Sequence, residues 1–312
     1  MKIRAYLLIM VGAIILPISL FAAVALQTLL RSEREAALQA LEETVSATAL
    51  LVDRELSSAE AALRVLAHSP HLAHGDMQAF YRHARSADRG KTGRTILFDP
   101  NGQQLINTVI PLGDPLPPPP DYVRVRTQRV IETQQTVVSG LITGAVQRVP
   151  VTTINIPVPL EGGRRYVLAS VFGTEYFTEL ISQRATPASW SLAVIDRNGR
   201  FIARTREPGR IGQMGKPELL RAAQGKTRGI IRARTLAGVD AYFAFTRSPM
   251  SGWLVAVSVP AAEIEGAAQR AVKLAAAGML VALLCAALAA VFFARRLVAS
   301  IRGAANAATM LG

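Results

Sequence analysis

TILFDPNGQQLINT, residues 95–108, and LAVIDRNGRFIART, residues 192–205, are two versions of one pattern. The second stretch begins 97 residues after the first. An Asn-Gly pair between apolar runs predicts a β-hairpin, because both turn positions favour positive φ. The repeat therefore predicts two hairpins in two similar units. The aligned residues are Asp99 with Asp196, Asn101 with Asn198, Gly102 with Gly199, and Thr108 with Thr205.

Further strand-like stretches follow each hairpin. TVVSGLITGAV, VPVTTINIPVPL and RRYVLASVF follow the first, and RGIIRARTLAG, VDAYFAFTRS and GWLVAVSVP follow the second. We therefore expect two tandem antiparallel units of five strands each. The prolines at 115 and 117–120 predict a surface loop. Helices are expected over residues 173–187 and 260–273.

Residues 27–66 have the pattern of a long helix, which Pro70 ends. Apolar or small residues recur at spacings of three and four, close to a heptad. Such a stripe packs either on the domain of its own chain or also on a second copy, and a homodimer is the prediction. The stripe comprises Leu38, Leu41, Val45, Thr48, Val52, Leu56, Ala59, Leu63 and Leu66.

Two uncharged apolar segments, residues 5–26 and 274–294, are each long enough to span a bilayer. The first could instead be a cleaved signal peptide, and the second a buried core helix. Basic residues precede the first segment and follow the second, so both termini are expected in the cytoplasm. Residues 28–271 would then lie in the periplasm, outside a bacterial inner membrane. The basic residues are Lys2, Arg4, Arg295, Arg296 and Arg302.

Composition excludes several classes of protein. Cys285 is the only cysteine, which excludes a disulfide scaffold and a site of several thiolates. The net charge of +13 is spread over the loops, and a periplasmic location argues against nucleic acid as a partner. Gly90-Lys91-Thr92 and Gly225-Lys226-Thr227 lack the upstream glycine of a phosphate loop. His68, His71, His74 and His83 cluster in sequence, but Pro70 and Gly75 interrupt any common helical face, so no metal is predicted.

The order of these elements resembles the double Cache sensor domain of bacterial transmembrane receptors. The resemblance rests on GQQLINTVIPLGDPLP (102–117), IDRNGRFIART (195–205) and SGWLVAVSVP (251–260), and it covers residues 28–271. It implies an α+β fold: a long N-terminal helix and two tandem PAS-like antiparallel-sheet units, flanked by two transmembrane helices. The family usually binds small molecules in the membrane-distal unit.

The resemblance divides the chain into six parts. These are residues 1–27 (cytoplasmic tip and first span), 28–67 (long helix), 68–185 (membrane-distal Cache unit), 186–271 (membrane-proximal Cache unit), 272–294 (second span) and 295–312. The last part has a heptad pattern at Leu297, Ile301, Ala304, Ala308 and Leu311 and resembles the start of a HAMP relay helix, although Ser300 stands where such helices usually carry proline.

Candidate ligand-binding residues lie on the predicted helix DYVRVRTQRVIETQQ. Tyr122, Arg126 and Arg129 fall at i, i+4 and i+7 on one face, where arginine could bind a carboxylate bidentately. The alternative is a solvated helix face. The following strands add Ser139, Thr143 and Asn155 as polar groups that could enter the same pocket.

The expected ligand is a small anion. Amino-acid-binding members of the family place an aspartate after the last distal strand, whereas this chain has Gly173-Thr174 there. That difference favours a carboxylate or other anion, with no cofactor.

We predict the input region of a sensor histidine kinase, with no enzyme inside these 312 residues. A diguanylate cyclase or a chemoreceptor is the alternative output. Two rivals belong to other classes: a membrane-anchored protein-interaction module without a small-molecule ligand, and an anchored periplasmic hydrolase.

Overall fold

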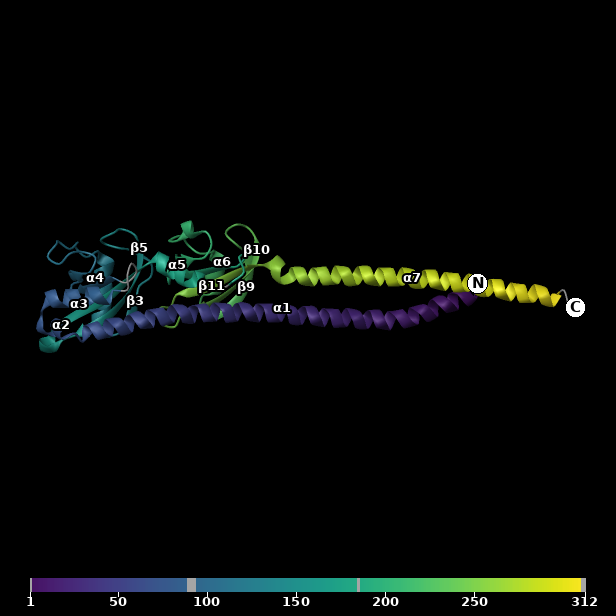
Figure 1. The fold of residues 1–312 in the computed structure, drawn as a ribbon, viewed down its shortest axis with the longest axis horizontal. Helices are drawn as coiled ribbons and strands as arrows, with labels where there is room; N and C mark the ends of the chain where they lie inside the picture. The colour runs from purple at the N-terminus through teal and green to yellow at the C-terminus, as the bar shows by residue number, and fades with distance from the viewer. Residues whose placement is uncertain (1, 89–93, 184–185, 310–312) are drawn as a thin grey trace. The chain divides into compact units, whose positions relative to one another are not determined.

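The computed structural model describes residues 2–88, 94–183 and 186–309. The chain divides into two compact units. One comprises Leu38–Pro260, and the other comprises the two terminal segments, residues 1–37 and 261–312. All the strands of the described chain lie in the unit Leu38–Pro260 (Figure 1). They form two β-sheets, and each sheet with its helices is one sheet unit.

Helix α1 (Lys2–Ala67) is continuous, as the sequence predicts. From Leu41 to Leu66 every residue of the predicted stripe is buried. Three carboxylates of α1 accept hydrogen bonds from the rest of the domain. Ser248 donates to Asp53, Tyr176 to Glu55, and Thr136 to Glu60. The stripe is thus covered by the chain's own domain, and a second copy cannot pack along it; the homodimer itself stays a prediction.

The first sheet unit contains strands β1–β6 and has the strand order β2-β1-β6-β5-β3, with β4 paired to β5. All pairs are antiparallel. Helices α2 (Pro70–His74), α3 (Met77–Ala87) and α4 (Asp121–Thr133) belong to this unit. The strands are β1 (Arg94–Phe98), β2 (Gln104–Asn107), β3 (Val137–Val138), β4 (Ile142–Thr143), β5 (Pro150–Pro159) and β6 (Arg165–Gly173).

The second sheet unit contains strands β7–β11 in the order β8-β7-β11-β10-β9, again antiparallel. Helix α5 (Thr174–Ser182) joins the units, and α6 (Pro217–Ala222) packs in the second one. Short 3-10 helices lie at Glu161–Gly163 and Pro208–Arg210. The strands are β7 (Ser191–Ile195), β8 (Phe201–Arg204), β9 (Arg228–Arg234), β10 (Asp240–Arg247) and β11 (Leu254–Pro260).

The α+β fold and the tandem antiparallel units are therefore confirmed, with one difference in the first unit. Its predicted third strand, residues 136–146, forms two two-residue strands, β3 and β4, on either side of Ser139–Leu141. The backbone there leaves the sheet because the amide of Leu141 and the carbonyl of Ser139 bond to the second unit instead.

Both predicted hairpins form, but their turns differ from the expectation. Gly102 and Gly199 have φ of +80° and +84°, whereas Asn101 and Asn198 are not in the positive-φ region. The amide of each glycine donates to the aspartate carbonyl, and the aspartate amide donates to the carbonyl of the residue after the glycine, so each turn carries a β-bulge at a left-handed glycine. The aspartate causes this geometry. Oδ1 of Asp196 accepts the amides of Asn198 and Arg200 at 2.9 and 2.8 Å, and Asp99 does the same in the first hairpin.

The two faces of the first sheet carry different helices. In β6, Val167 and Ala169 pack with Val123 and Val130 of α4, whereas Ser170 and Phe172 adjoin Leu63 and other residues of α1. This alternation is what a strand of period two requires. Helix α1 therefore covers one face and α4 the other.

Helix α7 (Ala261–Thr309) begins directly after β11. Within it, Ala261–Ala289 is long and apolar enough to cross a membrane, with a mean hydropathy of 2.2. The only span the structure supports among the described residues is this C-terminal one. The first predicted span, residues 5–26, is helical, but the side chains of residues 1–15 and 18 lie outside the described part, so it stays a prediction. The same holds for the relay pattern after Arg296, where only the helical backbone is described, up to Thr309.

Candidate ligand-binding site

A cavity of about 60 Å³, measured as the space open to the centres of water-sized spheres, lies in the first sheet unit. Strands β1, β2 and β6 form its floor, α4 one wall, and the segment from β4 to β5 another. A water occupies roughly 10–15 Å³ by this measure, so the cavity holds a molecule of about four to six heavy atoms. Its lining is mainly apolar, and the polar members are Arg94, Gln104, Asn107, Tyr122, Arg126, Gln147 and Thr153.

Arg126 is one of two arginines that line this cavity. The side chain is half-buried, but its Nε is fully buried and has no hydrogen-bond partner among the described residues. Burial lowers the pKa of the guanidinium to about 10, while the nearby Tyr122 opposes that change. The group is still charged at neutral pH. A buried charged donor without a partner is costly, so the cavity favours an occupant that accepts from it.

Tyr122 and Arg94 stand at the edge of the cavity. The hydroxyl of Tyr122 donates to the carbonyl oxygen of Thr143 at 2.5 Å, which ties α4 to β4. Burial raises the pKa of Tyr122, and Arg126 opposes the rise. Arg94 donates to the side-chain carbonyl of Gln147 across the opening. Among the described residues, none that line this cavity is acidic.

Four of the predicted site residues lie outside the lining. Arg129 is exposed and close enough to Arg197 of the second unit to lower the pKa of that guanidinium, after the larger effect of burial. Thr143 is exposed and contributes only its carbonyl to Tyr122. Asn155 is buried and donates to Val137 and Thr153. The structure thus brings Tyr122 and Arg126 together and separates Arg129 from them, because the buried face of α4 is formed by Val123, Thr127 and Val130.

Ser139 is the fourth predicted residue outside the lining, and it is part of the junction between the sheet units. Its Oγ accepts from the amide of Thr153 at 2.9 Å, and its carbonyl oxygen accepts from Nε1 of Trp253 at 3.1 Å. Two residues later, the amide of Leu141 donates to Oδ2 of Asp196 at 2.9 Å. Gly140 is required between them, since a Cβ there would lie 2.7 Å from the same Oδ2. The segment that leads into the cavity wall is thereby held by the second unit.

Sequence reasoning missed Gln104 and Asn107, although both lie in the repeat. They are buried, and Nδ2 of Asn107 donates to Oε1 of Gln104 at 2.7 Å. Two polar residues inside an otherwise apolar hairpin were the available signal. Arg94, Gln147 and Thr153 carried no comparable signal, because only the fold brings them to the cavity.

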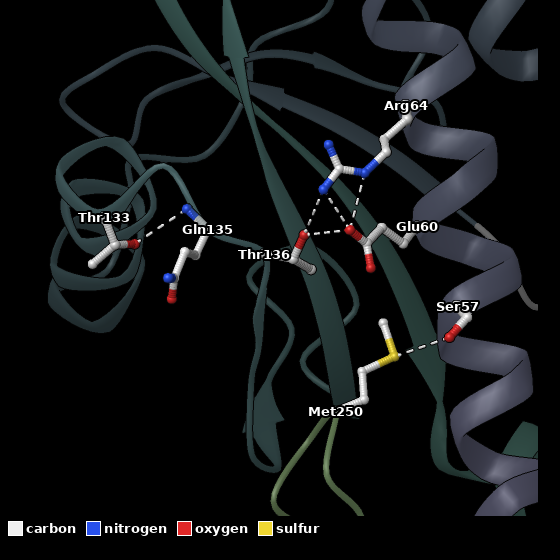
Figure 2. A network of polar contacts seen from close by, with 7 residues as sticks. All are labelled: Ser57, Glu60, Arg64, Thr133, Gln135, Thr136 and Met250. Carbon is white, nitrogen blue, oxygen red and sulfur yellow. Dashed lines mark hydrogen bonds and ion pairs between the residues drawn. The ribbon is translucent and has the colours of Figure 1, made fainter.

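Helix α1 contacts the first sheet unit at Thr136, which follows the end of α4 (Figure 2). Oε1 of Glu60 accepts from Oγ1 of Thr136 at 2.7 Å and from Nη2 of Arg64 at 2.6 Å. One turn earlier on α1, the hydroxyl of Ser57 donates to the sulfur of Met250, in the second unit, at 3.4 Å. Tyr176 of α5 also donates to Glu55. Residues of α1 separated by a single turn thus touch both sheet units.

Three of the four histidines bond to nearby residues. Nδ1 of His68 bonds to the carbonyl oxygen of Arg64 and Nδ1 of His74 to that of Pro70, and His83 bonds to Ser69. Within the described ranges, no three His, Cys, Asp or Glu residues come together in a way that could hold a metal ion.

Comparison with known proteins identifies the fold. No family model and no curated protein matches the sequence. Many solved structures resemble the chain, and three of them do so over 76% of its length. These are the ligand-binding domain of the Campylobacter jejuni chemoreceptor Tlp3 in complex with L-valine (TM-score 0.57, 16% identity, 97% of that chain), that of the Pseudomonas fluorescens chemoreceptor CtaA in complex with L-isoleucine (0.56, 14%, 97%), and the extracellular domain of mmHK1S-Z3, assigned as a histidine kinase (0.58, 12%, 98%).

The chain therefore has a double Cache-like fold, which it shares with the ligand-binding domains of these two chemoreceptors and with the extracellular domain of mmHK1S-Z3. The chemoreceptor and kinase domains match with nearly equal TM-scores. The likeness thus establishes the architecture of the chain and leaves its function to be argued from the site.

Proposed function

We propose that this chain is the ligand-sensing input region of a bacterial membrane receptor, and that the first sheet unit binds a small carboxylate. The observation that carries the proposal is Arg126: a charged guanidinium at a largely apolar cavity, with a buried Nε that has no partner among the described residues. A carboxylate supplies the missing acceptor and matches the guanidinium in charge and shape.

The chemistry of the lining argues against the amino-acid ligands of Tlp3 and CtaA. An α-ammonium group favours a carboxylate partner, and the described lining offers two arginines and no carboxylate. The side-chain carbonyl oxygens of Gln104 and Gln147 already accept from Asn107 and Arg94. Gly173 is the last residue of β6 and the N-cap of α5, and it stands where an amine-binding aspartate would be expected. A Cβ at this position would lie 2.5 Å from Oε2 of Glu175. An aspartate there would require Glu175 to move.

The proposed signal is a shift between two conformational populations. Ligand bound at Arg126 would bias the position of α4, whose C-terminus is followed by Thr136 and its bond to Glu60 of α1. The β4 wall of the cavity begins directly after Leu141, which bonds to Asp196. Trp253, held by the carbonyl of Ser139, precedes β11, and β11 continues into α7. These connections give the cavity two routes toward the predicted spans, each of which passes through hydrogen bonds and then along the chain.

The proposed topology places residues 28–271 in the periplasm between two spans, with a homodimer as the signalling state. For the output we propose a histidine kinase, with a chemoreceptor or diguanylate cyclase as alternatives. Fusing the chain to a kinase core and measuring ligand-dependent autophosphorylation tests whether the input can drive that output. Unchanged phosphorylation with a bound ligand would contradict it.

The binding proposal is tested with the full chain in nanodiscs of zwitterionic lipid. A panel of small carboxylates, amino acids, purines and sugars is screened by thermal unfolding, because a ligand at 100 times its Kd stabilises by about 2.7 kcal/mol. For the best carboxylate, Arg126→Gln is expected to weaken binding about 10–100-fold, the value of a hydrogen bond to a charged group. Calorimetric titration measures the Kd.

Arg129→Gln is the matched control, since it removes the same charge from an exposed position of the same helix. Its Kd should stay within about twofold of the wild type. Equal weakening by both variants would show that the charge of α4, and not the cavity, binds the ligand. A panel without any hit would favour the interaction-module alternative.

A further inference from the structure

The second sheet unit contains a cavity in the place that corresponds to the ligand cavity of the first. Ile96 pairs with Ala169 in the first sheet as Ala193 pairs with Ala256 in the second, and all four line the respective cavities. On the hairpin strands, Arg204 lies 97 residues after Asn107, and each lines its own cavity. The repeat thus places an arginine where the first unit has an amide.

Arg204 is a buried cation with incomplete hydrogen bonding. The residue is 8% exposed, and its Nε and Nη1 are buried without a partner in the described part of the chain. Nη2 reaches Oε2 of Glu207 at 3.4 Å, longer than the 2.7–2.9 Å typical of a charge-assisted bond. The guanidinium carbon lies 4.3 Å from the ring centroid of Phe201, which stabilises the charge but offers no acceptor to the N–H groups.

Arg204 lines two adjoining cavities. The inner one, of about 50 Å³ by the same measure as above, is lined mainly by apolar residues of the second core, among them Ile195, Leu219 and Phe243. The outer one, of about 380 Å³, is also lined by Arg206 and Glu207. Ser191 and Ser258 line both and add hydroxyl groups beside the guanidinium. An anionic head group would meet Arg204 and these hydroxyls, and a short apolar tail would enter the inner cavity.

We infer that the second sheet unit is itself a ligand-binding site, which binds a short-chain aliphatic carboxylate through Arg204. This site is separate from the one proposed at Arg126 and does not depend on it. About 50 Å³ corresponds to roughly three to five water-sized volumes, so a tail of two to four carbons fits. The double Cache architecture of this chain then carries two carboxylate sites, one in each unit.

The test uses the full chain in zwitterionic nanodiscs with Arg126→Gln as the background, so that failure of the first site does not affect the result. Sodium butyrate is titrated at constant ionic strength by calorimetry, with sodium sulfate as a second probe that lacks a tail. One butyrate per chain is expected in this background. Adding Arg204→Gln should weaken that binding at least 10-fold, and sulfate should bind at least 10-fold more weakly than butyrate.

Arg200→Gln is the matched control, because it removes the same charge from an exposed position of the same hairpin that lines neither cavity. Its side chain donates to the carbonyl of Gly212, and butyrate binding should change less than twofold. Arg204→Lys keeps the charge and protects the fold if the glutamine variant does not fold; about 5-fold weakening is expected, since lysine lacks the planar fork. Unchanged butyrate binding in either Arg204 variant, equal weakening by Arg200→Gln, or sulfate binding as tight as butyrate would overturn the inference.

Discussion

The first and second sheet units have the same strand order, the same aspartate-stabilised hairpin turn and a cavity at the same place. They differ in how their parts are held. Asp99 of the first hairpin accepts amides of its own turn through Oδ1, whereas Asp196 also accepts the amide of Leu141 from the other unit through Oδ2. The fold determines where a turn and a cavity lie, and individual side chains determine whether they also connect the two units.

The largest effect should come from removing these two aspartates. Asp196→Ala leaves three amides without their acceptor, one of them from the junction, and Asp196 is 3% exposed. We expect a loss of about 3–5 kcal/mol in unfolding free energy, against about 1–2 kcal/mol for Asp99→Ala, which loses two amide bonds at a less buried turn. Scanning calorimetry of both variants measures the melting temperatures. Equal losses would mean that the Leu141 bond adds nothing.

The next effect concerns two aromatic residues, Tyr166 near the start of β6 and Trp253 directly before β11. Since Ala169 and Ala256 are equivalent in register, Tyr166 and Trp253 are equivalent as well. Trp253 is fully buried, packs edge-on against Phe177 at 5.2 Å and bonds to Ser139, whereas Tyr166 is only half-buried. Trp253→Phe should cost about 1–3 kcal/mol, because it leaves a cavity and an unpaired carbonyl.

Tyr166→Phe is the control for this substitution and should change stability by less than about 0.5 kcal/mol, as is usual away from buried features. Both values come from the same calorimetric scans. If the two variants lost equal stability, the junction would not be the reason for the tryptophan.

The smallest effect is a pH dependence at the contact between α1 and the second unit. Burial raises the pKa of Asp53, and the hydrogen bond from Ser248 partly opposes the rise. A folded-state pKa above the unfolded value contributes stability below about pH 3.8, and that contribution is lost as pH rises through the folded pKa. Asp53→Asn should therefore gain in melting temperature relative to wild type as pH is raised from about 4 to 7.

Ser248→Ala sharpens this prediction. It removes the bond that lowers the pKa of Asp53, so the difference between the variants with and without Asp53 should become larger and extend to higher pH. A difference that is constant across this range would contradict the assignment to Asp53.

Much of the fold could be predicted from local patterns. The Asn-Gly repeat predicts both hairpins, the spacing of three and four predicts α1, and Tyr122 and Arg126 were recognised as one face of α4. The errors also have local causes. The turn type was wrong because the Asp99 and Asp196 side chains bond to the turn amides. The third strand was predicted as continuous because β-branched residues with high strand propensity lie on both sides of Ser139–Leu141.

The sequence by itself determined the two hairpins, the long helix and the repeat that makes the units equivalent. These depend on turn residues and apolar periodicity, which act over a few neighbouring positions. Only the tertiary structure decided which polar groups meet: Arg94, Asn107, Arg126 and Gln147 at one cavity, and Ser139, Asp196 and Trp253 at the junction. Their separations along the chain follow no period, because strand pairing and helix packing bring them together over long distances in sequence.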